Sequence, residues 1–387
     1  MSAAPFFGLA RKAAQRSRFQ SRLNELGFTE NSCAKFHQKI ANKNLSEIIN
    51  DLKTENIKPL QLLASFFFKT SEVDEHTNAV MEYVEDSIDF ALEIQNNFQQ
   101  KISEMPLLGL PISVKETFDM KGFATSRGIL SLSEKKLEND SFLIQFLKKM
   151  GGNIFVRTTV SESCASIMGD NLIIGKSYHP RNFFNKDKSI KTERTPGGSS
   201  SGETVLLACG ATILGWGSDG AGSIRIPSGF CGLPGLRSTS QRVSAKKENS
   251  KERNTLINTF SAPNCLSVGP ITRDVDSLVY VLKLIFGNEE ICSLDPYCFP
   301  IKFNQDMYES INKLNIGFLY GKVCSKKIGY LTRSVDEAKK ILIDKGHNLI
   351  SLENDFPDLE EVYNSLMMKI TCVDGGNSLT RALYYEI

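Results

Sequence analysis

Three segments of this chain hold residues whose types and spacing could carry out chemistry. The first is a short apolar run, 109–114, that ends in Lys115; the others read TPGGSSSGE over 195–203 and GSDGAGSIRIP over 217–227. Together they supply a lysine at the end of a predicted buried strand and two serines on glycine-rich turns. Burial lowers the pKa of a lysine from its usual value of about 10.4, so that a neutral amine can take a proton from a serine hydroxyl. The set predicts nucleophilic catalysis that needs no histidine.

Two further motifs match by spacing alone. The Gly-x-Ser-x-Gly pattern around Ser200 has the nucleophile-elbow spacing, but that motif follows a strand, and residues 191–196 are polar and end in proline. The Gly-x-Gly-x-x-Gly pattern of 215–220 has the dinucleotide-binding spacing, but Pro227 blocks the required helix start and no βαβ unit frames the pattern. We interpret both matches as chance.

Histidine and cysteine chemistry finds little support. The four histidines lie outside recognisable motifs, although His179, next to Pro180, stays open as part of a distant site. The nine cysteines are scattered without Cys-x-x-Cys spacing, which favours neither a disulfide framework nor a zinc ribbon and fits a reducing compartment.

In this order and at this spacing, the three segments resemble those of the amidase signature family. The stretches 228–236, 266–274 and 293–296 are in addition similar to the fatty acid amide hydrolases within that family. The resemblance runs from about Leu60 to the last residue. It implies a serine hydrolase that cleaves the amide or ester bonds of fatty acid amides through an acyl-enzyme, with roles in lipid metabolism and with neither a metal nor an organic cofactor.

The resemblance also implies a role for each site residue. Ser223 would be the nucleophile, Lys115 the start and end of a proton relay, and Ser199, held by a cis peptide bond, the bridge between them. The oxyanion hole and substrate-binding residues would be Gly220, Ala221, Gly222, Ser223 and Cys164, with Asp219, Arg225 and Ser200 in support.

The chain departs from the family at several positions. Ser201 and Ala221 stand where the family usually has glycine, and a positive φ at Ala221 would cost about 1 kcal/mol. At positions where related lipid amidases carry bulky channel residues, this chain has Cys164, Ala165, Ile167 and Cys372. We therefore regard a long-chain acyl preference as less firmly predicted than hydrolysis itself.

The resemblance stops at Ile387, so we expect the C-terminal part of the family's sheet to be missing. Two alternative functions stay open. One is a catalytically impaired, truncated paralogue that acts as a lipid-binding or interaction protein. The other is an amidase for small amides, or the amidotransferase subunit that forms glutaminyl-tRNA.

The elements that must position these residues follow an α/β pattern. Apolar residues at helical spacing predict helices across 34–103, and branched apolar residues predict a strand at 109–114. Further helices are predicted at 140–150, 274–286 and 334–345, and further strands at 153–156, 314–320 and 347–352, with an exposed polar loop at 246–253. The resemblance makes this an α/β/α sandwich with a mixed central sheet flanked by helices.

We predict a basic N-terminal helix within 1–30, followed by an amidase signature domain over 31–387. The basic residues of 10–26 favour a solvated helix, and peripheral membrane contact through it and a homodimer stay open. No signal peptide or spanning helix can be recognised, which favours a cytoplasmic location.

The composition is that of an ordinary globular protein. With 46 Lys and Arg against 44 Asp and Glu, the net charge of +2 excludes a strongly basic nucleic-acid binder. The 41% hydrophobic residues exclude predominant disorder. The expected partner, a small-molecule lipid amide, is what the resemblance implies.

Overall fold

The computed structural model describes residues 4–185, 193–244, 266–320 and 329–353. They fall into two compact units, which divide between Phe303 and Asn304. Unit 1 contains a five-stranded sheet, and unit 2 contains two parallel strands with helices. The predicted polar loop at 246–253 lies outside the described residues, and the predicted domain boundary near residue 30 stays a prediction.

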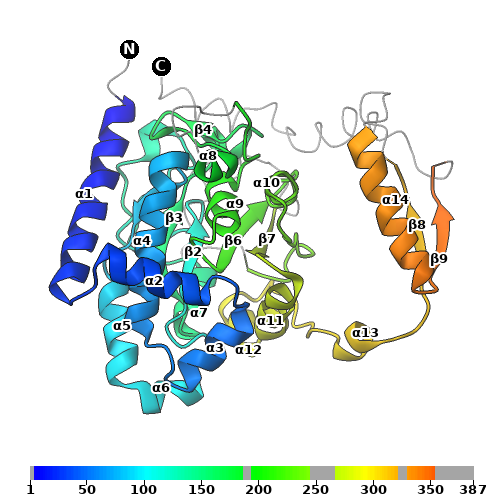
Figure 1. Ribbon diagram of the computed structural model, residues 1–387, viewed down its shortest axis with the longest axis horizontal. Helices are drawn as coiled ribbons and strands as arrows, with labels where there is room; N and C mark the ends of the chain where they lie inside the picture. Colours follow the sequence, from blue (N-terminus) through cyan, green and yellow to red (C-terminus); the bar gives the residue numbers. More distant parts are fainter. Residues whose placement is uncertain (1–3, 186–192, 245–265, 321–328, 354–387) are drawn as a thin grey trace. The chain divides into compact units, whose positions relative to one another are not determined.

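The sheet of unit 1 is mixed, as predicted (Figure 1). Its strands lie in the order β1 (Val80–Tyr83), β3 (Asn153–Thr158), β2 (Pro111–Lys115), β6 (Leu214–Asp219) and β7 (Ser267–Thr272). The central strand β2 pairs in parallel with β3 and β6, whereas β1 and β7 pair antiparallel with their inner neighbours.

Lys115 is the last residue of β2, the middle strand of the sheet. All five β2 residues are buried, including the polar Ser113 and Lys115, as expected for a central strand that is covered on both faces. In the β2–β3 register Lys115 lies opposite Thr158, and Asp219 ends β6. Because the carboxyl ends of parallel strands meet at one edge, these three residues are neighbours.

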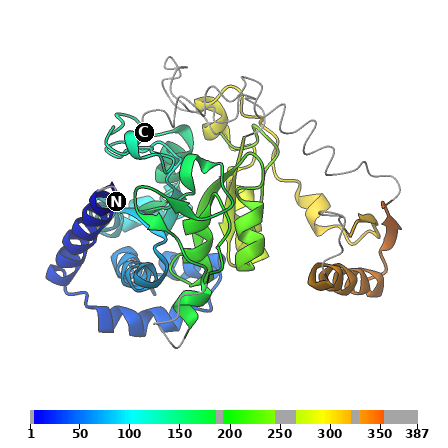
Figure 2. The same cartoon turned by 90° about the horizontal axis from the view of Figure 1, so that it is seen from above.

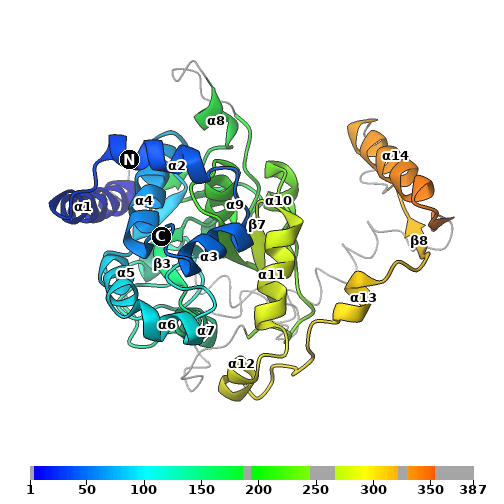
Figure 3. The same cartoon turned by 60° about the horizontal axis from the view of Figure 1, so that its bottom comes forward.

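Helices surround the sheet of unit 1 (Figures 1 and 2). Their bounds are α1 (Ala4–Glu25), α2 (Glu30–Ile40), α3 (Leu45–Lys53), α4 (Pro59–Thr77), α5 (Ser87–Asn96), α6 (Phe98–Glu104), α7 (Phe142–Lys149), α8 (Arg181–Phe184), α9 (Ser201–Ala208), α10 (Arg225–Cys231), α11 (Val275–Ile285) and α12 (Glu289–Leu294). Helix α9 packs across β2, β3 and β6, α1 packs on the edge strand β1, and α11 packs on the opposite edge strand β7 (Figure 3).

Helix α1 is packed against unit 1 along one face. Phe19 is fully buried and stacks on Phe67 of α4, with ring centroids 4.2 Å apart. Several of its basic side chains pair with acidic residues, among them Arg16 with Glu75. The predicted N-terminal helix is therefore confirmed. Only part of its surface is exposed to solvent, because one face packs against the rest of unit 1. Among the described residues, no helix is both long and apolar enough to cross a membrane.

Two predictions about local structure are wrong. Residues 80–83, which we assigned to a helix, form the edge strand β1, because Asn78 in the left-handed conformation ends α4 and the following residues are all buried. Pro227 does not block a helix: it is the third residue of α10, where its missing N–H has no intrahelical partner to lose.

Unit 2 has a simple β-α-β order. Its elements are α13 (Gln305–Glu309), β8 (Asn315–Phe318), α14 (Gly329–Asp344) and β9 (Asn348–Ser351), and β8 pairs in parallel with β9. The two strands and the helix predicted here are confirmed. The helices predicted at 140–150 and 274–286 and the strands at 109–114 and 153–156 are likewise present as α7, α11, β2 and β3 in unit 1.

Candidate active site

Lys115 is a fully enclosed residue of the predicted site. Its side chain is fully buried, and Nζ lies 2.7 Å from Oγ of Ser199 and 3.1 Å from Oγ of Ser218. Burial lowers the pKa of Lys115 and thereby favours the neutral amine. Charges on Cys164, Asp219 and Glu203 would raise this pKa, whereas the charge of Arg127 lowers it further.

The serine turn places Ser199 over the lysine. The peptide bond between Gly198 and Ser199 is cis, as the resemblance implies, and Ser199 is fully buried. A side chain at Gly198 would overlap the carbonyl oxygen of Ser166, so only glycine fits there. Helix α9 begins at Ser201, directly after this turn, and fixes it against the sheet.

Ser223 lies on the turn that follows β6. It is partly exposed, unlike Lys115 and Ser199, so a substrate can reach its hydroxyl. The two serine turns touch through the backbone, where the N–H of Ser200 donates to the carbonyl of Ser223 over 3.1 Å. Within the described residues no hydrogen bond joins the Ser199 and Ser223 side chains.

Asp219 anchors the Ser223 turn. Its fully buried carboxylate accepts from the N–H groups of Gly222 at 2.7 Å and Ile224 at 3.1 Å, and from Nε and Nη2 of Arg225 at 3.0 Å each. Burial would raise the pKa of Asp219, but these hydrogen bonds outweigh it and lower the pKa. Asp219 is thus held ionised as a support of the turn.

The N–H groups predicted for the oxyanion hole differ in whether they already have an acceptor. The N–H of Gly222 is already donated to Asp219, but none of the described residues accepts from the N–H groups of Gly220, Ala221 or Ser223. Positive φ falls on Gly222, at 127°, and not on Ala221, so the alanine carries none of the backbone cost considered from the sequence.

Two residues of the site were missed by the sequence analysis. Ser218 Oγ accepts from Nζ of Lys115, and the Glu203 carboxyl group of α9 accepts from the hydroxyls of Ser113 at 2.6 Å and Thr158 at 2.7 Å. Burial raises the pKa of Glu203 to about 8, against the opposing effects of both hydroxyls and of Lys115. A usable signal was a glutamate in the first turn of a helix whose later residues, 205–208, are all apolar.

Glu203 lies on the same face of the sheet as Lys115. Thr158 is the direct cross-strand neighbour of Lys115, and Ser113 is two residues earlier on the same strand, so the pleat points all three side chains to one face. A side chain at Gly215 of β6 would overlap the Glu203 carboxyl group, which explains that glycine.

The loop that contains Cys164 borders the site. Ser163 and Cys164 have positive φ values of 51° and 57°, which non-glycine residues adopt only under constraint. Burial raises the pKa of the Cys164 thiol, and the charges of Lys115 and Arg127 oppose this. The predicted channel position Cys372 lies outside the described residues.

Apolar side chains flank the serine turn. The backbone of Ile167 lies against Gly198, and the Phe230 ring lies against Gly197. Both side chains are exposed, Ile167 to 54% and Phe230 to 50%, so they offer apolar surface beside Ser199. His179, left open from the sequence, binds the carbonyl of Phe230 at 3.1 Å. In the part of the chain that the structure describes, no three His, Cys, Asp or Glu residues cluster to hold a metal.

The sequence profile of the family described as Amidase matches residues 61–385. This chain belongs to the amidase family. The match includes the Lys115 strand, the Ser199 turn and the Ser223 turn, and it agrees with the resemblance stated from the motifs.

Relatives of known name support this membership. The chain is 33% identical over 343 residues to the vitamin D3 hydroxylase-associated protein of Gallus gallus, across 88% of this chain and 69% of that protein. It is 31% identical over 306 residues to fatty-acid amide hydrolase 1 of Sus scrofa, across 79% of this chain and 49% of that protein. The chain thus spans only about half of the porcine protein.

A solved structure confirms the fold. A structure titled fatty acid amide hydrolase aligns with a TM-score of 0.75 and 21% identity, over 96% of this chain and 67% of that one. An aryl acylamidase of the amidase signature enzymes aligns with a TM-score of 0.73 and 19% identity, over 89% and 67%. The predicted amidase-signature α/β fold is therefore present.

Proposed function

We propose that this chain is a serine hydrolase that cleaves the amide or ester bonds of fatty acid amides through an acyl-enzyme on Ser223. The observation that carries the proposal is the 2.7 Å contact between two fully buried groups, Lys115 Nζ and Ser199 Oγ, beside the partly exposed Ser223 turn. Such a buried lysine is suited to act as a base, because its charged form is poorly solvated.

The relay moves one proton through two serines. The neutral amine of Lys115 takes the proton of Ser199, and Ser199 takes that of Ser223 after a rotation of the Ser223 side chain toward it. Ser223 Oγ then attacks the substrate carbonyl carbon, and the oxygen becomes an oxyanion. The N–H groups of Gly220, Ala221 and Ser223 would stabilise it, each such donor being worth about 2.7 to 4 kcal/mol.

The proton then returns to the leaving group. Protonated Lys115 passes it back through Ser199 to the amine nitrogen, the carbon–nitrogen bond breaks, and the amine leaves an ester on Ser223. Water, deprotonated by the same relay, hydrolyses this ester and releases the fatty acid. Lys115 and Ser199 thus carry every proton transfer to and from Ser223, the leaving amine and the water.

An apolar acyl group fits the surroundings of the relay. Ile167 and Phe230 present exposed apolar surface beside the serine turn, which a hydrocarbon chain can cover. The named relatives include a fatty-acid amide hydrolase, which supports the same substrate class.

The test is hydrolysis of a long-chain fatty acid primary amide, measured as release of ammonia. We expect wild-type turnover and a loss of at least about 10³ in Ser223→Ala, because the acyl-enzyme cannot form. Ser240→Ala, at a partly buried serine away from the relay, serves as the matched control and should keep full activity. A folded wild type that binds the fatty acyl group without turnover would contradict the proposal and favour a lipid-binding role.

A further inference from the structure

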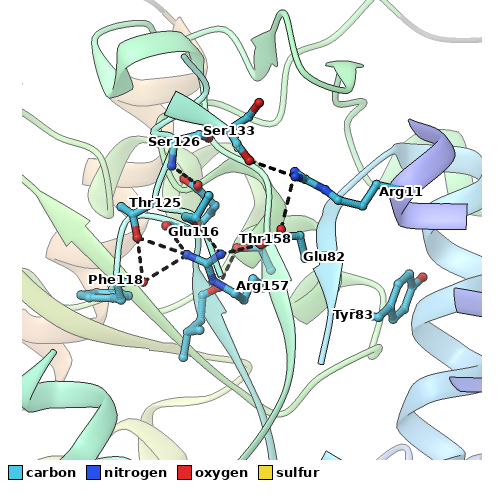
Figure 4. A network of polar contacts seen from close by, with 12 residues as sticks. Arg11, Glu82, Tyr83, Glu116, Phe118, Thr125, Ser126, Ser133, Arg157 and Thr158 are labelled. Atoms are coloured by element: carbon cyan, nitrogen blue, oxygen red, sulfur yellow. Dashed lines mark hydrogen bonds and ion pairs between the residues drawn. The ribbon is translucent and has the colours of Figure 1, made fainter. Parts of the chain in front are cut away.

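A chain of charged side chains, two of them buried, leads from helix α1 to the residue that follows Lys115 (Figure 4). It consists of Arg11 on α1, Glu82 on β1 and Arg157 on β3. We call these three residues the arginine clamp. The Arg157 side chain is fully buried and that of Glu82 is 5% exposed, so neither charge would be tolerated there without its partner.

Arg157 binds carbonyl groups in the first part of segment 116–133. Its guanidinium pairs with Glu82 and donates to the carbonyl oxygens of Glu116 at 2.8 Å, Ala124 at 2.7 Å and Phe118 at 3.2 Å. Residues alternate between faces along a strand, so Arg157 holds this segment from the face opposite to Thr158 and Lys115. A planar guanidinium with several donors suits such a task, and a lysine does not.

Arg11 grips the other end of the same segment. Its Nη1 donates to the carbonyl oxygen of Ser133 at 2.9 Å, and its Nη2 lies 3.5 Å from Oε1 of Glu82. Figure 4 shows Glu82 between the two arginines and Ser133 beside Arg11. The clamp therefore ties both ends of segment 116–133 to α1, β1 and β3.

The segment in turn shapes the surroundings of Lys115. The Glu116 carboxylate accepts from the N–H groups of Ser126 and, at 2.9 Å, Arg127, and it thereby fixes the Arg127 backbone. The charge of Arg127 lowers the pKa of Lys115. Thr117 Oγ1 also lies 3.3 Å from Oγ of Ser218, a direct partner of Lys115.

We propose that Arg11, Glu82 and Arg157 are positioning residues for Lys115, so that helix α1 belongs to the catalytic architecture. This inference rests on the proposed function, because it assigns the clamp to the same relay. Without the clamp, segment 116–133 moves, Arg127 withdraws, and water reaches Lys115. The pKa of Lys115 then rises, and more of the amine is protonated and idle at a given pH.

The groups that set the Lys115 pKa keep their chemical identity when Arg11 is changed. Cys164, Asp219, Glu203 and Arg127 are the charged or titratable residues that act on its amine. None of them is a clamp residue, so a change at Arg11 alters their position and not their chemistry.

The experiment compares Arg11→Gln with Arg16→Gln in the full chain. Both remove one ion pair of α1 at a side chain that is about one third exposed, but Arg16 pairs with Glu75 outside the clamp. The readout is the second-order rate of Ser223 labelling by a fluorophosphonate between pH 6 and 10. Thermal unfolding of each variant is measured alongside.

We expect Arg11→Gln to slow labelling by about threefold to tenfold at neutral pH and to move the midpoint of the pH profile upward. Arg16→Gln should match the wild type in labelling rate and in pH midpoint. The two variants should have similar thermal unfolding midpoints. Glu82→Gln, which keeps the side-chain shape, should shift the profile further. The inference is overturned if Arg11→Gln and Arg16→Gln have the same rate and the same pH midpoint.

Hydrogen exchange separates this inference from the proposed function. Arg11→Gln should speed exchange of the Ser126 and Arg127 amides, which Glu116 binds, and Arg16→Gln should not. A wild type that does not label defeats the proposed function, while this exchange pattern still decides whether the clamp holds the segment. Equal exchange in both variants counts against the clamp.

Discussion

Lys115 and Glu203 are two buried ionisable groups on one face of the sheet, and both are shifted toward their neutral forms. Burial lowers the pKa of Lys115 and raises that of Glu203 to about 8. A neutral Glu203 adds no negative charge beside the lysine, so Lys115 can stay a neutral base. Ionisation of Glu203 at high pH would favour protonated Lys115.

The Glu203 pKa has a consequence for stability. The folded state holds the Glu203 proton up to about pH 8, and the unfolded state loses it near pH 4.5. Since the folded state binds more protons in this window, the associated stability is full below pH 4.5 and is lost as pH rises toward 8. Glu203→Gln removes this dependence, so urea unfolding should show a smaller loss of stability from pH 5 to pH 9 than in the wild type. Glu75→Gln, at a residue with a 57% exposed side chain, is the control, and equal pH slopes in Glu203→Gln and wild type would refute the assignment.

The sequence was sufficient to predict that Lys115 and Ser199 belong to one site and that a cis bond precedes Ser199, because a family resemblance covers those motifs. It was not sufficient for Ser218 and Glu203. Their contacts depend on which strands adjoin β2 and on how α9 crosses them, and neither is encoded in local spacing.

At the scale of elements, the edge of the sheet shows why local patterns can mislead. Residues 80–83 are buried at every position, and a short run of this kind, apolar except for Glu82, fits a buried helix or a buried strand equally well. Only pairing with β3 decides between them. By contrast, β2 was predictable because its flanking Gly109 and Pro111 disfavour a helix.

Helix α1 should contribute to the stability of unit 1. Phe19→Ala removes a buried ring stacked on Phe67, so we expect the free energy of unfolding to fall by about 3 to 5 kcal/mol. Phe7 lies on the same helix and is 74% exposed, so Phe7→Ala is the matched control. It should change the free energy of unfolding by less than about 0.5 kcal/mol. Equal, small effects in denaturant titrations would show α1 to be an independent segment, as the boundary near residue 30 would allow.

At the scale of the whole molecule, the proposed relay lies entirely within unit 1. Lys115, Ser199 and Ser223 come from three separate stretches of sequence and meet at one edge of its sheet. The chain spans 69% and 49% of the two named relatives, so the substrate of the complete protein stays a proposal. The apolar surface beside the proposed relay is what supports the proposed lipid substrates.

That surface predicts a chain-length effect. Ile167→Asp places a charge beside the serine turn, so kcat/KM should fall about tenfold for a long-chain amide and little for a short-chain amide. Leu26→Asp, at a residue 43% exposed beyond the end of α1, should leave the ratio of the two values unchanged. An equal loss for both amides would assign Ile167 to the structure of the turn and not to acyl binding.

The most direct test of the relay is to locate the fluorophosphonate adduct by mass spectrometry in wild type, Ser223→Ala, Lys115→Ala and the exposed-lysine control Lys121→Ala, each shown to be folded by circular dichroism. We expect the adduct on Ser223 in wild type and Lys121→Ala, no adduct in Ser223→Ala, and a rate at least about 10² lower in Lys115→Ala. An adduct on another residue, or a folded Lys115→Ala that labels as fast as the wild type, would contradict the Ser223–Ser199–Lys115 relay.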